Sequence, residues 1–233
     1  MNPGLGLMHI EDNEVIEDLQ CDGLKIIARR DGFRYGTDSI LLANFVKAGI
    51  SGHIVELCSG SGAVSLLLSA KTRAARITGV EIQGRLVEMS NRSAILNGIE
   101  DKVKFLNFDI KEIRGRMGAG SAKAVAVNPP YIPLGSGAGG ADESAAIARH
   151  EIFCELHDVT DAAKWLLAPG GLFYIVFRPE RLTDLLCAMR ESGIEPKEIQ
   201  PAGASAGKPP SLILVRGIKG AAPGVRFMGH KNI

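Results

Sequence analysis

Apolar residues along the chain follow two patterns that alternate with one another. Short continuous runs rich in β-branched residues are typical of buried strands, and they occupy residues 53–58, 76–82, 102–109, 122–128 and 172–177. Stretches with helical spacing lie at residues 63–72, 84–98 and 151–167, and a further helix is predicted from Pro179 to about Ser192. Strands separated by helices form a mostly parallel sheet with helices on both faces.

Two final strands are predicted at residues 195–201 and 210–218, and no helix separates them. They predict an antiparallel hairpin at one edge of the sheet, which makes seven strands in all. The predicted fold class is therefore α/β, with a seven-stranded, mostly parallel sheet and an antiparallel edge hairpin.

The chain before this sheet predicts less structure. Residues 24–29 favour a strand, and Thr37 or Asp38 is the expected N-cap of a helix that ends at Phe45. We divide the chain into a flexible lead (residues 1–20), a hairpin and helix that pack on the core (residues 21–50), and the core itself (residues 51–233).

Charge changes this picture only at the ends of the chain. Among 233 residues the formal net charge is +1, but residues 11–22 carry six acids and residues 197–233 carry six bases and one acid. A basic end is typical either of a surface that meets a polyanion or of an ordinary solvated face, and charge alone favours the solvated face.

Composition excludes several other classes of protein. Hydrophobic residues make up 45% of the chain, which permits a sizeable core. The four cysteines include no Cys-x-x-Cys pair, so we expect neither a structural metal nor a disulfide framework. No apolar stretch is long enough to span a membrane, and the first residues do not form a signal peptide. We expect a cytoplasmic protein without a membrane or metal partner; its oligomeric state is open, with a monomer favoured.

Candidate chemistry gathers where the predicted strands end, because ligands of open α/β sheets bind at the carboxyl ends of the strands. The first strand runs into Glu56 and then into a turn that contains Ser59, Gly60 and Gly62. Such a turn lets a ligand approach the backbone. A dinucleotide fingerprint would continue with Gly or Ala at the position of Ser65, so a cationic or hydroxylated ligand suits this strand end better than a pyrophosphate.

The next two strands also end in acidic residues. Glu81 closes the second strand, in a position to accept hydrogen bonds from two ribose hydroxyls, and Ile82 could cover one face of an adenine. Asp109 follows the third strand and could accept a hydrogen bond from an adenine amine. Each acid alone would suit a solvated strand end, but three acids at successive strand ends favour a shared ligand.

The fourth strand ends in Asn128, Pro129, Pro130 and Tyr131, followed by a glycine-rich segment, residues 134–146. Asn128 offers an amide oxygen, and Pro130 restricts Pro129 to an extended backbone that helps aim its carbonyl outward. Two acceptors of this kind can hold one exocyclic amine, and Tyr131 offers a flat face for stacking. The motif therefore favours an acceptor with a planar amino group, either an adenine or an amide.

Several stretches together resemble the class I S-adenosylmethionine-dependent methyltransferases that carry an Asn-Pro-Pro-Tyr motif, and most closely the bacterial tRNA adenine-N(6) methyltransferase group. These stretches are residues 33–45, 56–68, 79–101, 128–131, 146–151, 166–182 and 219–224. The resemblance implies a Rossmann-like fold, S-adenosyl-L-methionine as cofactor, and methyl transfer to an exocyclic adenine amine in RNA, most of all tRNA.

The resemblance also implies roles for individual residues. The cofactor would contact the residues Thr37, Asp38, Glu56, Ser59, Gly60, Gly62, Glu81, Ile82, Asp109 and Asn128. The residues Asn128, Pro129, Pro130 and Tyr131 would hold the acceptor base and count as catalytic, while Lys208, Arg216 and Lys219 would contact phosphates. The chain departs from the family pattern at Cys58, where a glycine is usual, at Glu56, where Asp is usual, and at Ala141-Asp142, where Asn-Pro is common.

In this interpretation catalysis depends on positioning and electrostatics, without a catalytic histidine or metal. His150 could support the site residues or anchor a loop, or it could be an ordinary histidine at a helix N-terminus. Three alternatives stay open: methylation of a glutamine side-chain amide in a protein, an NAD-dependent oxidoreductase that uses the glycine turn and Glu81, and an inactive RNA-binding module.

Overall fold

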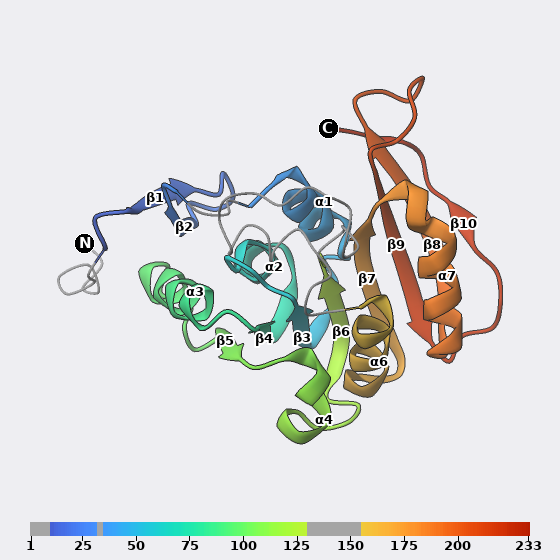
Figure 1. The fold of residues 1–233 in the computed structure, drawn as a ribbon, viewed down its shortest axis with the longest axis horizontal. Helices are drawn as coiled ribbons and strands as arrows, with labels where there is room; N and C mark the ends of the chain where they lie inside the picture. Colours follow the sequence, from blue (N-terminus) through green and yellow to red (C-terminus); the bar gives the residue numbers. More distant parts are fainter. Residues whose placement is uncertain (1–9, 32–34, 130–154) are drawn as a thin grey trace.

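A twisted sheet forms the centre of the computed structural model, which describes residues 10–31, 35–129 and 155–233 (Figure 1). Its nine strands are β3 (Ser51–Leu57), β4 (Arg73–Glu81), β5 (Val103–Asn107), β6 (Ala122–Val127), β7 (Leu167–Phe177), β8 (Ile194–Gly203), β9 (Leu212–Lys219), β10 (Arg226–Phe227) and β11 (Lys231–Asn232). The order across the sheet is β10-β8-β9-β7-β6-β3-β4-β5, and β11 also pairs with β8. The seven strands expected from the sequence are β3 to β9, and the two short strands β10 and β11 are additional.

The strand directions agree with the sequence prediction. Strands β5, β4, β3, β6 and β7 are parallel, whereas β9 runs antiparallel to both β7 and β8. The strand order reverses beside β3, because β4 lies on one side of it and β6 on the other. Such a switch point is where open α/β sheets bind ligands.

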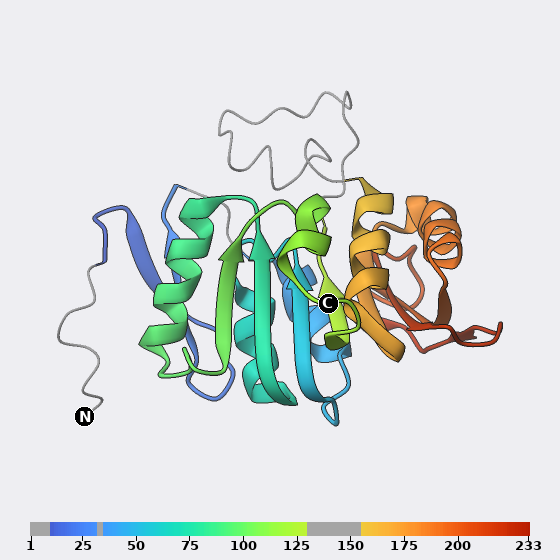
Figure 2. The same cartoon turned by 90° about the horizontal axis from the view of Figure 1, so that it is seen from below.

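Helices cover both faces of the sheet, as Figures 1 and 2 show. The helices α1 (Thr37–Phe45), α2 (Ala63–Lys71) and α3 (Gly84–Leu96) lie on one face, and α4 (Ile113–Arg116), α6 (Leu156–Leu166) and α7 (Leu182–Glu191) lie on the other. Successive side chains of a strand point to opposite faces. On β7, accordingly, Tyr174 belongs to the same apolar cluster as Leu42 and Leu67, while Phe173 belongs to the cluster that contains Val125 and Leu166. The two apolar clusters are the two halves of the core.

A separate hairpin precedes the sheet. It consists of β1 (Glu14–Asp18) and β2 (Lys25–Arg29), which pair antiparallel. Residues 14–18 therefore form a strand, although the sequence led us to place them in a flexible lead. Their sequence is acidic, but Glu14 is buried against Arg92 of α3, with Nη2 and Oε1 2.6 Å apart. That partner is 78 residues away, so no local pattern predicts it.

Two boundaries differ from the prediction for local reasons. The N-cap of α1 is Gly36 rather than Thr37 or Asp38, because the Asp38 carboxylate accepts from the adjacent N–H of Ser39 instead of capping the helix. Strand β7 begins at Leu167, so residues 168–171 belong to the strand, where the register between β6 and β7 shifts.

The remaining differences concern short elements. Two 3-10 turns, η2 (Ile110–Glu112) and η3 (Pro179–Arg181), precede α4 and α7, and neither η2 nor α4 was predicted. Helix α6 begins at Leu156 after a capping box formed by Glu155 and Asp158; the expected earlier start at residue 151 lies outside the described residues. None of the helices in the described ranges has the length and apolar character needed to cross a lipid bilayer.

Candidate functional site

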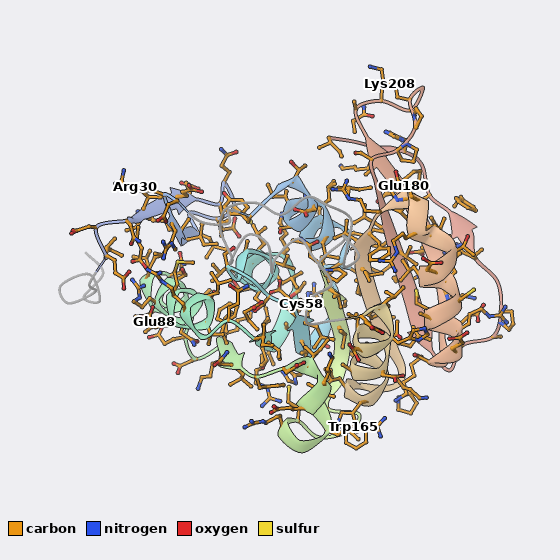
Figure 3. All side chains as sticks on the ribbon, viewed as in Figure 1. Arg30, Cys58, Glu88, Trp165, Glu180 and Lys208 are labelled. Atoms are coloured by element: carbon orange, nitrogen blue, oxygen red, sulfur yellow. The ribbon has the colours of Figure 1, made fainter. Side chains whose placement is uncertain are left out.

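The loop that follows β3 adopts a tight left-handed turn at the switch point. Cys58, Gly60 and Gly62 have φ values of 56°, 52° and 81°. A β-carbon on Gly62 would lie 2.6 Å from Cζ of Phe105, so only glycine fits there. Figure 3 places Cys58 near the centre of the molecule. A non-glycine residue in this conformation is strained, and such strain is common at ligand-binding loops.

Glu56 is the buried acid of this loop region. Glu56 is 1% exposed, and its Oε2 accepts two hydrogen bonds from Ser65, one from the backbone N–H at 2.9 Å and one from the hydroxyl at 2.5 Å. Burial raises the pKa of the Glu56 carboxyl to about 8, although the Ser65 bonds oppose that shift. Ser65, which the sequence identified only as a departure from a dinucleotide fingerprint, is therefore the residue that holds Glu56.

Glu81 is the last residue of β4, and it accepts hydrogen bonds from the loop after β3 and from the loop after β4. Its Oε2 accepts from the Gly60 N–H at 2.9 Å, and its Oε1 accepts from the Gln83 N–H at 3.0 Å. Burial raises the pKa of the Glu81 carboxyl, and these backbone bonds oppose the shift. The backbone of Ile82 and the side chain of Gln83 also hydrogen-bond to this carboxylate, so its position at the end of β4 is fixed by several contacts. Beside it, Ile82 is 38% exposed.

Asp109 lies two residues beyond the end of β5, in a half-buried position. Its Oδ1 accepts from the N–H of Lys111 at 2.9 Å and so caps η2. The neighbouring Asn107 donates from Nδ2 to the carbonyl oxygens of Glu81 and Ile82. Asn107 was not among the predicted site residues, and it connects the end of β5 to the end of β4.

Ser59 contains an unusual polar atom. The serine is 6% exposed, and its buried Oγ has no hydrogen-bond partner among the described residues. Buried hydroxyls almost always have a partner, so an orphan beside the turn at Gly60 marks a position where a ligand atom can bond. Ser59, Gly60 and Gly62 are all residues that the sequence assigned to the cofactor.

Asn128 follows the last residue of β6. It is half-buried, and its Nδ2 donates to Oγ of Ser39 at 3.2 Å. Ser39 is 6% exposed and lies in the first turn of α1, next to Asp38; Thr37 before it is exposed. The hydroxyl therefore orients the Asn128 amide from a helix 89 residues away in the sequence. A polar residue on the buried face of a predicted helix was the only signal that could have identified Ser39.

The rest of the predicted acceptor motif is only partly described. Pro129 is buried. Pro130 and Tyr131 lie outside the described residues, as do residues 134–146, Ala141-Asp142 and His150.

Strand register brings the described candidates together. Leu57 of β3 is level with Val80 of β4 and with Val127 of β6. Glu81 and Asn128 are the next residues on those two strands, so they flank the loop that begins at Cys58. Two buried carboxyls and an oriented amide thus lie at the carboxyl ends of three adjacent strands.

Two of the predicted phosphate contacts, Arg216 and Lys219, are wrong, because both side chains already bind groups of the protein. Arg216 is 6% exposed and makes two bonds to Glu198, with distances of 2.7 Å from Nε to Oε2 and 2.6 Å from Nη2 to Oε1. The bond to Arg216 holds the pKa of Glu198 at about 2. Lys219 donates from Nζ to the carbonyl oxygens of Lys164 and Leu167. Lys208 is exposed.

No metal site accompanies these residues in the described part of the chain, where no three His, Cys, Asp or Glu side chains gather closely enough to hold an ion. The only cysteine in the loop after β3, Cys58, is a free thiol.

Comparison with known proteins adds a family and several relatives. The family model described as the methyltransferase small domain matches residues 30–189. A tRNA1(Val) (adenine(37)-N6)-methyltransferase of Porphyromonas gingivalis is 27% identical over 158 residues, which are 65% of this chain and 61% of the relative. The enzyme of the same name from Aeromonas hydrophila is 25% identical over 188 residues, with 80% and 77% covered. A 4-amino-L-phenylalanine/4-methylamino-L-phenylalanine methyltransferase of Streptomyces pristinaespiralis is 25% identical over 60% of this chain and 48% of its own length.

Solved structures show the same fold. A crystal structure of a predicted O-methyltransferase from Agrobacterium tumefaciens superposes with a TM-score of 0.68 at 20% identity, covering 84% of this chain and 86% of that one. TYW2 from P. horikoshii superposes with a TM-score of 0.60 at 14% identity, covering 91% and 74%. The first of the curated relatives is matched over 61% of its length, so part of it has no counterpart in the match.

Proposed function

Because the chain belongs to the methyltransferase small domain family, we propose that it transfers a methyl group from S-adenosylmethionine to the exocyclic N6 amine of an adenine in tRNA. The observation that carries this proposal is the oriented amide of Asn128 at the end of β6, beside the two buried carboxyls of Glu56 and Glu81. The Asn128 amide suits an acceptor with an amino group. The Glu56 and Glu81 carboxyls suit a cofactor that has a cationic end and two ribose hydroxyls.

The residues after β3 and β4 fit the proposed cofactor. The ammonium group of its methionine part would stabilise the ionised form of Glu56, whose pKa burial otherwise raises to about 8. Glu81 is proposed to accept hydrogen bonds from the ribose hydroxyls, and Ile82 is exposed enough to cover the adenine. The buried orphan hydroxyl of Ser59 would gain a partner. Thr37, Asp38 and Asp109 are proposed to border the same pocket.

When bound, S-adenosylmethionine supplies a methyl group on a positively charged sulfur. The chain's own contribution is to present the acceptor nitrogen. An adenine amine is a poor nucleophile because its lone pair is delocalised into the ring. Hydrogen bonds from its two N–H groups to Oδ1 of Asn128 and to the carbonyl of Pro129 would turn that lone pair out of conjugation.

Ser39 has a supporting role in this scheme. By accepting from Nδ2 of Asn128, its hydroxyl helps to hold the amide in place. Pro130 is proposed to keep Pro129 extended, and Tyr131 is proposed to stack on the base. The target base must leave its stack to reach such a site. The rate enhancement then comes from positioning and electrostatics rather than from a strong base.

The relatives support an amino group on an aromatic ring as the acceptor. Two of the names specify an adenine N6 position, and a third specifies 4-amino and 4-methylamino compounds of phenylalanine. A glutamine amide in a protein stays the second candidate, since Asn128 and Pro129 would hold either group. The family match favours methyl transfer over the oxidoreductase alternative.

The test is to incubate the protein with methyl-labelled S-adenosylmethionine, unfractionated tRNA and a mixture of cell proteins, and to measure how the label divides between RNA and protein. The proposal predicts label in RNA. Asn128→Ala is predicted to keep its affinity for S-adenosylmethionine and to lose most of the transfer rate. Label found only in protein would favour methylation of a glutamine amide instead. A protein that binds NADH and not S-adenosylmethionine would favour the oxidoreductase.

A further inference from the structure

The edge of the sheet farthest from the hairpin carries a surface that the proposed reaction does not use. It consists of Lys208, Arg226, Phe227, Met228 and Lys231, which we call the C-terminal rim. Lys208 lies in the connection between β8 and β9, at the tip labelled in Figure 3, and the other four lie in or beside β10 and β11. All five are exposed.

Strand register places the rim level with the candidate site. Across the sheet, β6, β7, β9, β8 and β10 align through the residues Val127, Ile175, Val215, Ile199 and Phe227. Phe227 is therefore level with the residue before Asn128, four strand spacings away, which is roughly 19 Å. Lys231 pairs with Ala202, three residues farther along β8, or about 10 Å nearer the carboxyl edge. The rim thus lies towards the carboxyl end of β8, at the edge of the same twisted sheet.

The rim is positively charged. Residues 199–233 contain no Asp or Glu. The nearest acid on β8 is Glu198, which binds Arg216 and Arg226 and lies 3.7 Å from Nζ of Lys47. One carboxylate therefore faces three cations, and the side chain of Arg226 is still 75% exposed. Such a surface attracts a polyanion.

The apolar part of the rim suits stacking. Phe227 is 72% exposed, and Met228 beside it is 42% exposed. Single exposed apolar residues are ordinary, but an uncovered aromatic ring between two cations has the composition that proteins use to bind unpaired nucleotides, with rings on bases and cations on phosphates.

A second copy of the chain fits the rim less well. Strands β10 and β11 have only two residues each, so they offer little edge for strand addition. In a symmetric dimer through this surface, the cations of one copy would also face those of the other.

We propose that the C-terminal rim binds an unpaired part of the RNA substrate while another nucleotide occupies the site, with Phe227 stacked on a base and Lys208, Arg226 and Lys231 on phosphates. This proposal rests on the proposed function, because it takes RNA as the substrate.

The test measures binding of unfractionated tRNA by fluorescence anisotropy over a series of salt concentrations. Phe227→Ala is predicted to weaken binding about five-fold or more, the effect of losing one stacked base. The double variant Lys208→Ala/Lys231→Ala is predicted to lower the slope of log affinity against log salt by about 1.4 to 1.8. Matched controls are Lys123→Ala, at the amino end of β6, and Ile95→Ala on α3, both exposed and away from the rim.

The outcomes separate the two proposals. If the wild-type protein methylates tRNA and the rim variants bind it with unchanged affinity and salt slope, the rim proposal alone is overturned. If the wild-type protein neither binds nor methylates RNA, both proposals fall. If Phe227→Ala converts a dimer to a monomer in sedimentation and leaves tRNA affinity unchanged, the rim is a contact between copies and the proposal is overturned.

Discussion

Replacing Glu56 by glutamine tests the electrostatics of the candidate cofactor site. Glutamine has nearly the same shape, and its amide oxygen can still accept from Ser65, but it cannot ionise. In the folded protein the pKa of Glu56 is about 8, against an ordinary value of 4.5. The folded state therefore keeps a proton that the unfolded state has lost between these two values, and stability must fall as pH rises through that window.

The magnitude follows from the same two values. While the folded carboxyl is protonated and the unfolded one is ionised, the free energy of unfolding falls by about 1.4 kcal/mol per pH unit, and the whole window corresponds to roughly 5 kcal/mol. Glu56→Gln removes this slope. Burial also raises the pKa of Glu81, so that carboxyl leaves a slope of the same sign in the variant.

The assay is urea unfolding of the protein without cofactor at about pH 6 and about pH 7.5. The wild-type protein is predicted to lose about 2 kcal/mol more than Glu56→Gln between these two conditions. Glu100→Gln, which changes an exposed acid on the turn after α3, is the control and is predicted to match the wild type. Equal pH dependence in the wild type and Glu56→Gln would refute the reasoning. In saturating S-adenosylmethionine the wild type is predicted to gain more stability than the variant.

Three further predictions concern other parts of the chain. Arg216→Ala removes the main partner of buried Glu198, which keeps Arg226 and Lys47, and is predicted to cost about 1.5 to 3 kcal/mol in the free energy of unfolding. Since the pKa of Glu198 is about 2 in the folded state, the stability of the wild type is predicted to fall as pH drops from 4.5 towards 2. Arg216→Ala is predicted to show a smaller fall in an acid titration, and an equal fall would contradict the role of Arg216. Ser39→Ala is predicted to slow methyl transfer about five-fold without changing cofactor affinity, and Ser39→Thr to restore it; a changed cofactor affinity would point to a structural defect instead. Gly79→Ala would place a β-carbon 2.3 Å from Cδ1 of Phe105, so it is predicted to lower the thermal midpoint, with partial recovery on adding Phe105→Leu; additive effects would exclude the contact as the cause.

The architecture of the sheet could be predicted because its information is local. The apolar runs at β3, β4 and β6 are buried on both faces, and a strand buried in this way has a continuous apolar sequence. The direction of β9 also followed, because no helix separates it from β8. What failed was structure stabilised by distant partners: β1 depends on the ion pair of Glu14 with Arg92, and its own acidic sequence gave no sign of it.

The candidate site shows the same division. Strand ends located Glu56, Glu81 and Asn128, because parallel strands bring their carboxyl ends to one edge. Sequence offered only the burial of a polar residue on a helix face for Ser39 and no signal for Asn107, because their roles depend on hydrogen bonds to residues 89 and about 25 positions away. It also misassigned Arg216 and Lys219, because a basic residue on a strand looks the same in sequence whether it meets solvent, a buried carboxylate as Arg216 does, or backbone carbonyls as Lys219 does.

The central claim is that the site methylates the N6 amine of an adenine in tRNA, and analysis of the nucleosides tests it most directly. Unfractionated tRNA is incubated with the protein and methyl-labelled S-adenosylmethionine, digested to nucleosides and separated by liquid chromatography with mass detection. We predict that the label elutes as N6-methyladenosine and disappears with Asn128→Ala. Label in any other nucleoside, or N6-methyladenosine that persists in Asn128→Ala, would contradict the account.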